Sequence, residues 1–120
     1  MSAAERSPTP LGPLDAMRAD PGHHEVLLEN EHVRVLDARV GPGEETAIHT
    51  HVWPGALYVI SWSDFLRLDP EGKVLVDSRT MASPPGPGEC LWGPPLPPHR
   101  VRNIGGTELR IIAVELKTPV

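Results

Sequence analysis

Two histidines, His49 and His51, have the residue type and the spacing that most directly suggest chemistry in this sequence. Residues two apart in a β-strand lie on the same face, about 6.5–7 Å apart along the strand, so both imidazoles can point at one spot. Neutral imidazole is a common ligand of divalent transition metals. A third histidine, His99, lies far along the chain, and a folded sheet would have to bring it to the other two. This geometry predicts a metal site.

Short predicted strands surround these histidines. Apolar residues recur in short stretches, and the turn signals Gly41-Pro42-Gly43 and Pro70-Glu71-Gly72 separate some of them. The predicted strands are residues 25–28, 32–40, 46–52, 56–62, 64–69, 73–78, 89–92, 99–104 and 109–116. The last is almost continuously apolar, as expected of a strand buried on both faces. This many short strands with turns between them predicts an all-β sandwich or barrel.

The length and composition fit one small domain. The chain has 120 residues, of which 39% are hydrophobic, and this suffices for a single modest core. Fifteen prolines and eleven glycines argue against long helices and for many turns. Residues 1–22 are rich in proline, alanine and serine and lack sustained periodicity. We therefore expect a flexible N-terminal arm over residues 1–22 and a barrel domain over residues 23–120.

The charge and the apolar pattern argue against several classes of partner. The formal net charge of −5 and the scattered positions of eleven lysines and arginines argue against nucleic acid. No apolar run approaches the roughly 20 residues of a membrane helix, and no signal-peptide pattern opens the chain. The single cysteine, Cys90, cannot form an internal disulfide. We therefore expect no membrane partner and a cytoplasmic protein.

The early histidine segment resembles the first sequence motif of the cupin superfamily. That motif runs glycine, five residues, His-x-His, three or four residues, glutamate, and then a hydrophobic strand. Gly43, His49 and His51 match it, and an apolar stretch follows. The glutamate is absent, because Gly55 or Ala56 stands in its place, depending on the spacing chosen.

The later histidine segment resembles the second cupin motif, Pro-x-Gly-x-x-His-x-x-x-Asn. Pro94, His99 and Asn103 match it, while a leucine replaces the glycine. The resemblance covers nearly the whole chain apart from the arm. It implies a double-stranded β-helix, or jelly-roll, barrel that holds a metal in its mouth, with His49, His51 and His99 as the ligands. Because this fold hosts many unrelated reactions, it does not decide the chemistry.

Without the glutamate, the implied ligand set consists of three neutral imidazoles, which leave open positions for water or substrate. The ion keeps its full charge, so the centre should be a strong Lewis acid that attracts anionic or enolisable chelating substrates. The set resembles that of three-histidine iron cupins, including thiol dioxygenases and diketone-cleaving dioxygenases. Iron is the first candidate, and Zn, Ni or Cu also suits imidazole. The alternative is a vestigial site that binds no metal.

Other residues near the motifs are candidates for the pocket. If Ala56 keeps the inward register of the family's glutamate, alternation places Tyr58 inward too. Tyr58 would then be a catalytic acid or hydrogen-bond donor, or else a core aromatic. Trp53 and Trp92 are predicted to wall the pocket. Cys90 has the parity of Trp92 and is predicted to face the interior as a small hydrophobe.

Several further polar residues are weaker candidates for the site. His23 and His24 end the arm and are predicted to be solvent-exposed linker residues. Glu45 is rejected as a substitute carboxylate, because an extended strand places it about 13 Å from His49. Four strand arginines are candidate anion clamps for a carboxylate substrate, with a solvated outer face as the alternative: Arg34, Arg39, Arg100 and Arg102.

The leading functional hypothesis is a metal-dependent, dioxygenase-like oxidoreductase that acts on a small organic acid, diketone or thiol. Two alternatives stay open. One is a non-catalytic module that binds a small molecule or a metal, and the other is a metal-dependent isomerase or lyase with Tyr58 as its acid or base. We also expect a homodimer, because small cupins commonly pair through sheet edges and the arm could cover an exposed edge strand.

Overall fold

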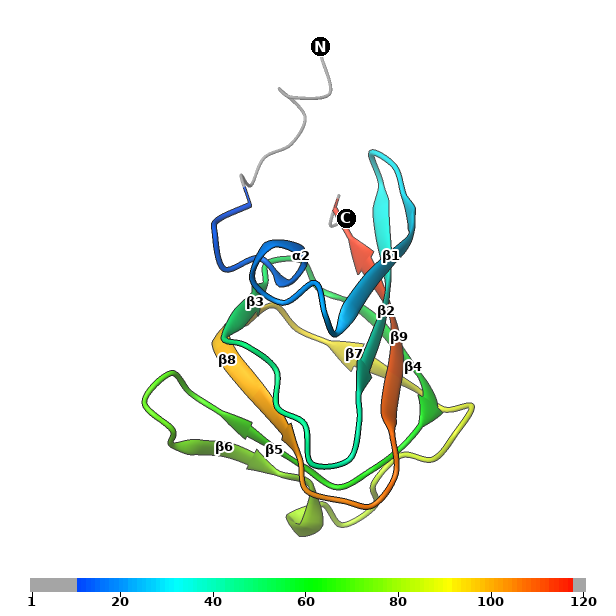
Figure 1. Ribbon diagram of the computed structural model, residues 1–120. Helices are drawn as coiled ribbons and strands as arrows, with labels where there is room; N and C mark the ends of the chain where they lie inside the picture. The colour runs from blue at the N-terminus through cyan, green and yellow to red at the C-terminus, as the bar shows by residue number, and fades with distance from the viewer. Residues whose placement is uncertain (1–10, 118–120) are drawn as a thin grey trace.

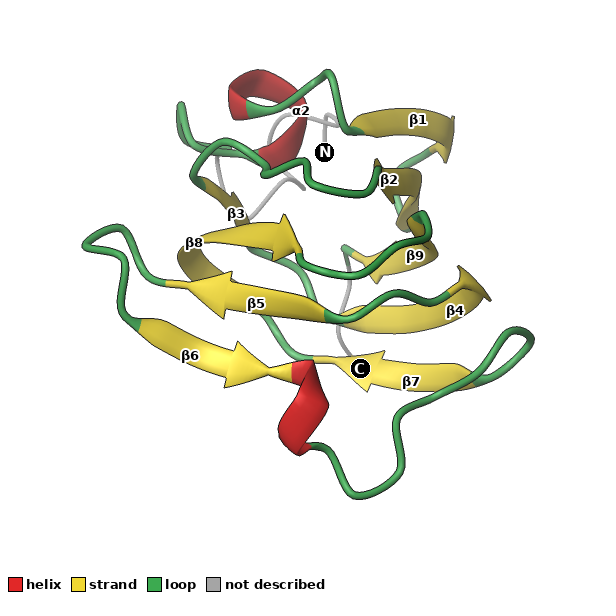
Figure 2. Cartoon of the chain, turned by 60° about the horizontal axis from the view of Figure 1, so that its bottom comes forward, coloured by secondary structure: helices red, strands yellow, loops and turns green. Residues whose placement is uncertain are grey.

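The computed structural model describes residues 11–117, and in this part of the chain two antiparallel sheets face each other (Figure 1). The first sheet has the order β1 (His24–Glu29), β2 (Val33–Val40), β9 (Leu109–Leu116), β4 (Gly55–Ser61), β7 (Cys90–Gly93). The second has the order β3 (His49–His51), β8 (Leu96–Asn103), β5 (Phe65–Leu68), β6 (Val74–Asp77). Figure 2 shows the two sheets from another side. The mostly-β architecture confirms the predicted fold class.

Two strand boundaries differ from the prediction in ways that matter for the site. β1 begins at His24, one residue earlier than expected. β8 begins at Leu96, inside the proline-rich stretch that was expected to be a loop. Prolines 97 and 98 of β8 have no backbone N–H to donate, and the β3–β8 pairing shifts register between His49 and His51. The short β3 is therefore an irregularly paired strand.

The core lies between the sheets, and β2 and β9 supply much of it. These two strands pair along eight residues, from Val33 with Leu116 to Val40 with Leu109. Leu36 is fully buried, and Val40, Leu109 and Ala113 are each no more than 7% exposed. The prediction that β9 is buried on both faces was wrong for its outer face, where the residues are half-buried.

The register of β4 is shifted by one residue from the prediction. Gly55 and Val59 are buried, whereas Ala56, Tyr58 and Ile60 are exposed. A Cβ at Gly55 would collide with the backbone carbonyl oxygen of Val114 on β9, so no side chain fits at this inward position. Because side chains alternate along a strand, a one-residue shift turns the whole set to the other face.

Helical structure is sparse in the described part of the chain. Residues 11–117 contain α2 (Ala16–Ala19) and one 3-10 turn, η1 (Ser78–Thr80). Asp15 caps α2, because its carboxylate accepts a hydrogen bond from the Met17 backbone N–H at 3.1 Å. No helix in residues 11–117 is long and apolar enough to span a membrane.

The second half of the predicted arm is packed against the barrel. Asp15 and Ala16 are 1% and 0% exposed. The Thr50 backbone N–H donates to the Leu14 carbonyl oxygen at 2.7 Å, so this segment lies beside β3. The expectation of a flexible arm was therefore wrong for residues 11–22, and residues 1–10 lie outside the described part of the chain.

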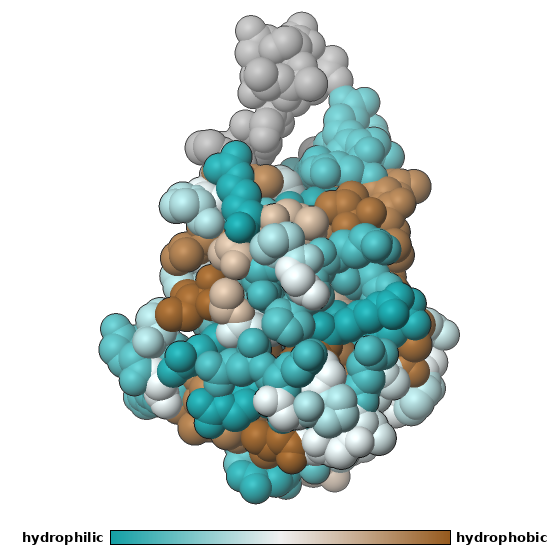
Figure 3. All heavy atoms as spheres, in the orientation of Figure 1, coloured by the Kyte–Doolittle hydropathy of each residue, from teal (hydrophilic) through white to brown (hydrophobic). Residues whose placement is uncertain are grey.

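Some large apolar side chains remain on the surface. Figure 3 shows hydrophobic atoms gathered over β1, where Val26, Leu27 and Leu28 are 37%, 51% and 51% exposed. On β4 and β7, Tyr58 and Trp92 are 41% and 64% exposed. The homodimer stays a prediction, and these side chains are the apolar surface that such a contact would have available.

Candidate metal centre

Four histidine rings lie together between the two sheets. His49 and His51 come from β3, His99 from β8 and His24 from β1. The ring centroids of His49 and His51 are 5.0 Å apart, and that of His99 lies 4.4 Å from His49 and 5.7 Å from His51. The ring of His24 lies 4.8 Å from His49 and 5.6 Å from His51. We call these four residues the histidine cluster.

The strands explain why three of these rings meet. His49 and His51 are two residues apart on β3 and share a face. His99 is the register partner of His49 across the β3–β8 pair. Directly paired residues on antiparallel strands point to the same side of the sheet. The structure therefore brings together the three histidines that the sequence indicated, and their role as ligands is taken up below.

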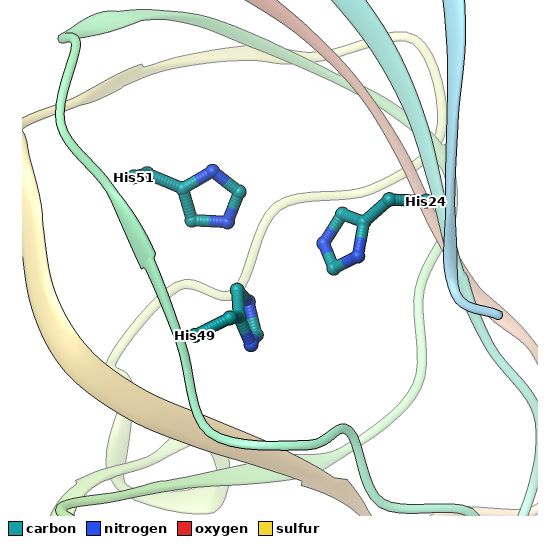
Figure 4. Close-up of side chains that lie close together, drawn as sticks. All are labelled: His24, His49 and His51. Atoms are coloured by element: carbon teal, nitrogen blue, oxygen red, sulfur yellow. The ribbon is translucent and has the colours of Figure 1, made fainter. Parts of the chain in front are cut away.

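His24 was predicted to be an exposed linker residue, and this prediction was wrong. It is 7% exposed and pairs with Ala38 on β2, on the same face as the buried Leu36. Its potential ligand atom and those of His49 and His51 lie within 4.8 Å of one another (Figure 4). The strand was expected to begin at residue 25, and that one-residue error excluded His24 from the inward face.

His23, the neighbour of His24, lies outside the cluster. Its Nδ1 is 2.9 Å from Oδ1 of Asp20, and its Nε2 is 3.6 Å from Oε1 of Glu44. Adjacent residues of an extended chain point to opposite sides, so the two histidines have different surroundings.

Each ring of the cluster is held through its Nδ1 by an oxygen that can only accept a hydrogen bond. Three of these acceptors are backbone carbonyls and the fourth is a carboxylate. The pairs are His24 with Asp20 O at 3.0 Å, His49 with Ala47 O at 2.8 Å, His99 with Pro97 O at 2.8 Å, and His51 with Glu115 Oε2 at 2.9 Å. Nδ1 must therefore carry a proton, so in the neutral form of each ring the lone pair is on Nε2.

Burial keeps His24, His49 and His99 neutral. It lowers the pKa of His49 to about 3 and that of His99 to about 4, although each Nδ1 bond to a backbone carbonyl acts in the opposite direction. Burial also lowers the pKa of His24. Desolvation disfavours the charged imidazolium, and neighbouring histidines add to the effect. The buried rings are neutral donors at physiological pH, as metal binding requires.

A buried chain of charges joins the cluster to the arm. Glu115 on β9, which orients His51, also accepts a hydrogen bond from Nε of Arg34 at 2.7 Å. The two terminal nitrogens of Arg34 donate to the two carboxylate oxygens of Asp15, each at 3.0 Å. The side chains of Asp15, Arg34 and Glu115 are 1%, 2% and 4% exposed. Arg34 is thus a fully paired interior residue, neither an anion clamp nor a solvated outer-face residue as predicted.

The missing glutamate of the first motif has a counterpart on another strand. Gly55 occupies the inward position on β4 and has no room for a side chain. Its register partner on β9 is Glu115. A carboxylate is therefore present beside His51, but it bonds Nδ1 rather than standing among the four Nε2 atoms. Sequence reasoning missed Glu115 because it lies in an apolar run without a motif.

Four other predicted site residues lie elsewhere. Tyr58, Trp92 and Cys90 are exposed, because the true register of β4 and β7 turns Tyr58 outward with its partner Cys90. Their predicted inward positions were therefore wrong. Trp53 is 7% exposed, and its ring lies 4.9 Å from the guanidinium carbon of Arg34. The Trp53 ring therefore packs against the guanidinium that bonds Glu115.

The other predicted anion clamps are occupied by carboxylates. Arg39 donates to Asp37, with 2.9 Å between Nη2 and Oδ2. Arg102 donates to Glu45 through Nε at 2.6 Å, and a terminal nitrogen of Arg100 lies 3.6 Å from the same carboxylate. These pairs and the exposure of Arg39 and Arg102, whose side chains are 51% and 46% exposed, favour the alternative interpretation, a solvated outer face.

Comparison with known proteins finds solved structures with a similar fold. No protein-family model and no curated protein matches the sequence. A cupin domain from Bordetella pertussis is 28% identical and matches with a TM-score of 0.64, over 79% of this chain and 92% of the other. A protein with a double-stranded β-helix domain from Klebsiella pneumoniae is 21% identical, with a TM-score of 0.55 over 98% of this chain and 83% of the other.

A polyketide cyclase from Streptomyces resistomycificus also shares the fold, at 21% identity and a TM-score of 0.51, over 79% of this chain and 64% of the cyclase. The facing sheets, the two histidine motifs on β3 and β8, and the similarity to these double-stranded β-helices agree with one another. The chain has the double-stranded β-helix fold of these proteins and is similar to a cupin domain.

Proposed function

We propose that the histidine cluster binds one divalent transition metal ion and that the protein uses it in dioxygenase-like chemistry on a small organic molecule. The observation that carries the metal is that the potential ligand atoms of His24, His49 and His51 lie within 4.8 Å of one another. Because each Nδ1 bonds an acceptor, the neutral rings would bind through Nε2. A cluster of neutral imidazole donors suits Fe, Zn, Ni or Cu, and carboxylate-preferring ions fit it poorly.

Two sets of three histidines compete as the ligands, and they share His49 and His51. The potential ligand atoms of His24, His49 and His51 lie within 4.8 Å of one another. The family motif instead favours His99 as the third ligand, and its ring is the closest to His49. Either set supplies three imidazoles and leaves positions for water and substrate.

Glu115 would act on the metal from outside the ligand set. A carboxylate bonded to Nδ1 of a ligating histidine fixes the ring and raises the basicity of Nε2. The adjacent Arg34 and Asp15 hold Glu115 in place in turn. The bound ion would supply a Lewis acid and, if it is iron, a centre for oxygen activation.

The alternatives from the sequence differ in how much support the geometry gives them. An isomerase or lyase that uses Tyr58 as its acid or base has none, because Tyr58 lies on the outer face of β4. A non-catalytic metal-binding module needs only the cluster. Oxygen consumption by the iron-loaded protein with candidate organic acids, diketones and thiols separates it from an oxygenase.

The test of the metal is metal content by mass spectrometry on protein purified without an affinity tag. We expect about one equivalent of a transition metal in the wild type and none in the His49→Ala/His51→Ala double variant. His24→Ala and His99→Ala decide which residue is the third ligand. His23→Ala is the matched control, since His23 lies outside the cluster, and it should keep the metal.

A stability measurement provides a second readout. Because a bound metal stabilises the folded state, a chelator should lower the melting temperature of the wild type and of His23→Ala, but not that of the double variant. If neither the wild type nor His23→Ala holds metal even after anaerobic reconstitution with iron, zinc, nickel and copper, the proposal is wrong.

A further inference from the structure

Arg67 on β5 faces the inside of the barrel next to the histidine cluster. Its register partner on β8 is Val101, two residues from His99 and on the same face. Phe65, two residues before Arg67 on the same face of β5, is 7% exposed. Since His99 is the register partner of His49, Arg67 lies on the face of its sheet that carries the histidine cluster.

This guanidinium has no anionic partner among residues 11–117. Its Nε is fully buried without a hydrogen bond, and no carboxylate in the described part of the chain offsets its charge. Burial alone acts on the pKa of Arg67 and lowers it. A cation withdrawn from water is costly unless it is paired and hydrogen-bonded, so an unpaired one inside a barrel calls for an explanation.

Arg100, on the neighbouring strand, shows that the absence of a partner is specific to Arg67. Its Nε is also buried without a hydrogen bond, but a terminal nitrogen lies 3.6 Å from Glu45. Arg100 alternates with His99 and Val101 on β8 and so points to the other side of the sheet. The two arginines are similar in burial and in strand position, and only the inward one lacks a counter-charge.

We propose that Arg67 binds the carboxylate of a small ligand that occupies the barrel beside the histidine cluster. A guanidinium presents parallel N–H donors that match a carboxylate, and such a pair would supply both the missing charge and the missing hydrogen bonds. The His51 side chain is 18% exposed, so the cluster is open to solvent on that side. The inference rests on the proposed function for the other end of the ligand, which would reach the metal.

The substrate class then follows from the two charged groups. A metal on neutral imidazoles and a free guanidinium both favour an anion. The carboxylates beside the cluster act on other groups: Glu115 bonds Nδ1 of His51 and Nε of Arg34, and Oδ2 of Asp20 lies 3.4 Å from Nδ1 of His24. Small organic acids are thus favoured over neutral diketones as ligands. Sequence reasoning named four arginines as anion clamps and did not consider this one.

The test uses glycolate and its uncharged analogue glycolamide, which have nearly the same shape. Affinities are measured by calorimetry on the full-length protein, whose metal content is determined in parallel. We expect the wild type to bind glycolate at least about tenfold more tightly than glycolamide, because a charged hydrogen-bonded pair contributes that much. Arg67→Gln should lose most of this preference and keep its metal, whose charge still favours the anion. Arg67→Lys should keep part of it, and Arg100→Gln all of it.

Each outcome separates this inference from the proposed function. A preference that is undiminished in Arg67→Gln means that the metal alone attracts the anion, which overturns the inference and leaves the metal site standing. Equal affinities in the wild type, or loss of metal from Arg67→Gln, also overturn it. If the wild type holds no metal but its preference for glycolate still depends on Arg67, the proposed metal fails and the anion site stands.

Discussion

Arg34 and Arg67 both point into the barrel, from opposite sheets, and they differ most in their carboxylate partners. Arg34 on β2 is 2% exposed and hydrogen-bonds two carboxylates. Burial alone would lower its pKa, but the bonds to Asp15 and Glu115 outweigh burial and raise it. Arg67 on β5 is half-buried with no carboxylate, so burial lowers its pKa without opposition.

The difference separates a structural role from a ligand-binding role. Arg34 holds the arm to β9 and keeps Glu115 on His51, so its partners are already in place before any ligand arrives. Arg67 has N–H donors without a carboxylate partner in residues 11–117, and it lies beside the same cluster. Interior burial of an arginine is therefore not informative by itself, and the presence or absence of a counter-charge decides what it does.

The largest expected effect is at the paired arginine. Arg34→Met leaves the buried carboxylates of Asp15 and Glu115 without a cation, and breaking a buried ion pair in this way costs about 3–5 kcal/mol of stability. The measurement is the free energy of unfolding from urea titrations. The control is Arg39→Met, whose exposed side chain should cost no more than about 1 kcal/mol. Equal losses in the two variants would show that the Arg34 chain is not structural.

A smaller effect is expected in a charge group on the outer face, where Asp37 accepts hydrogen bonds from Arg110 and Arg39. The bonds from Arg110 are the largest influence and lower the pKa of Asp37, burial opposes them, and Arg39 adds to them. A carboxyl whose pKa is depressed on folding stabilises the protein above its unfolded value, near 3.8, and this contribution is lost as pH falls through the folded pKa.

The check is a series of urea titrations from pH 6 to pH 2.5. At neutral pH Asp37→Asn should be less stable than the wild type. The gap should begin to narrow near the unfolded pKa of 3.8 and should close only as pH falls through the lower folded pKa, where the native carboxyl becomes protonated. A gap that stays constant across the series would mean that the hydrogen bonds to Asp37 contribute nothing through its charge.

Part of the site could be predicted from the sequence, although the contrast between the two arginines could not. The histidines of β3 and β8 could be predicted because a short local spacing places His49 and His51 on one face, and the second motif adds His99. The alternating strands and their turn residues were sufficient for the fold class. These signals are local, so a single sequence contains them.

The rest of the site depends on which strands become neighbours. Glu115 reaches the site because β9 pairs with β4, which places it opposite Gly55. Arg67 lacks a counter-charge because its partner on β8 is Val101 and not a carboxylate. Neither fact can be read from the residues around Glu115 or Arg67. Strand starts and registers matter as much, since a one-residue error hid His24 and turned Tyr58 to the wrong face.

The smallest expected effect on stability is at the unpaired arginine. Arg67→Met removes a half-buried cation without depriving any carboxylate of its partner, and a long apolar side chain can fill much of the same space. The free energy of unfolding should therefore stay within about 1 kcal/mol of the wild type or increase, in contrast to Arg34→Met in the same urea titrations. A loss as large as that of Arg34→Met would mean that Arg67 stabilises the fold through an interaction of its own. Its lack of a counter-charge would then no longer indicate a ligand, and the distinction between the two arginines would fail.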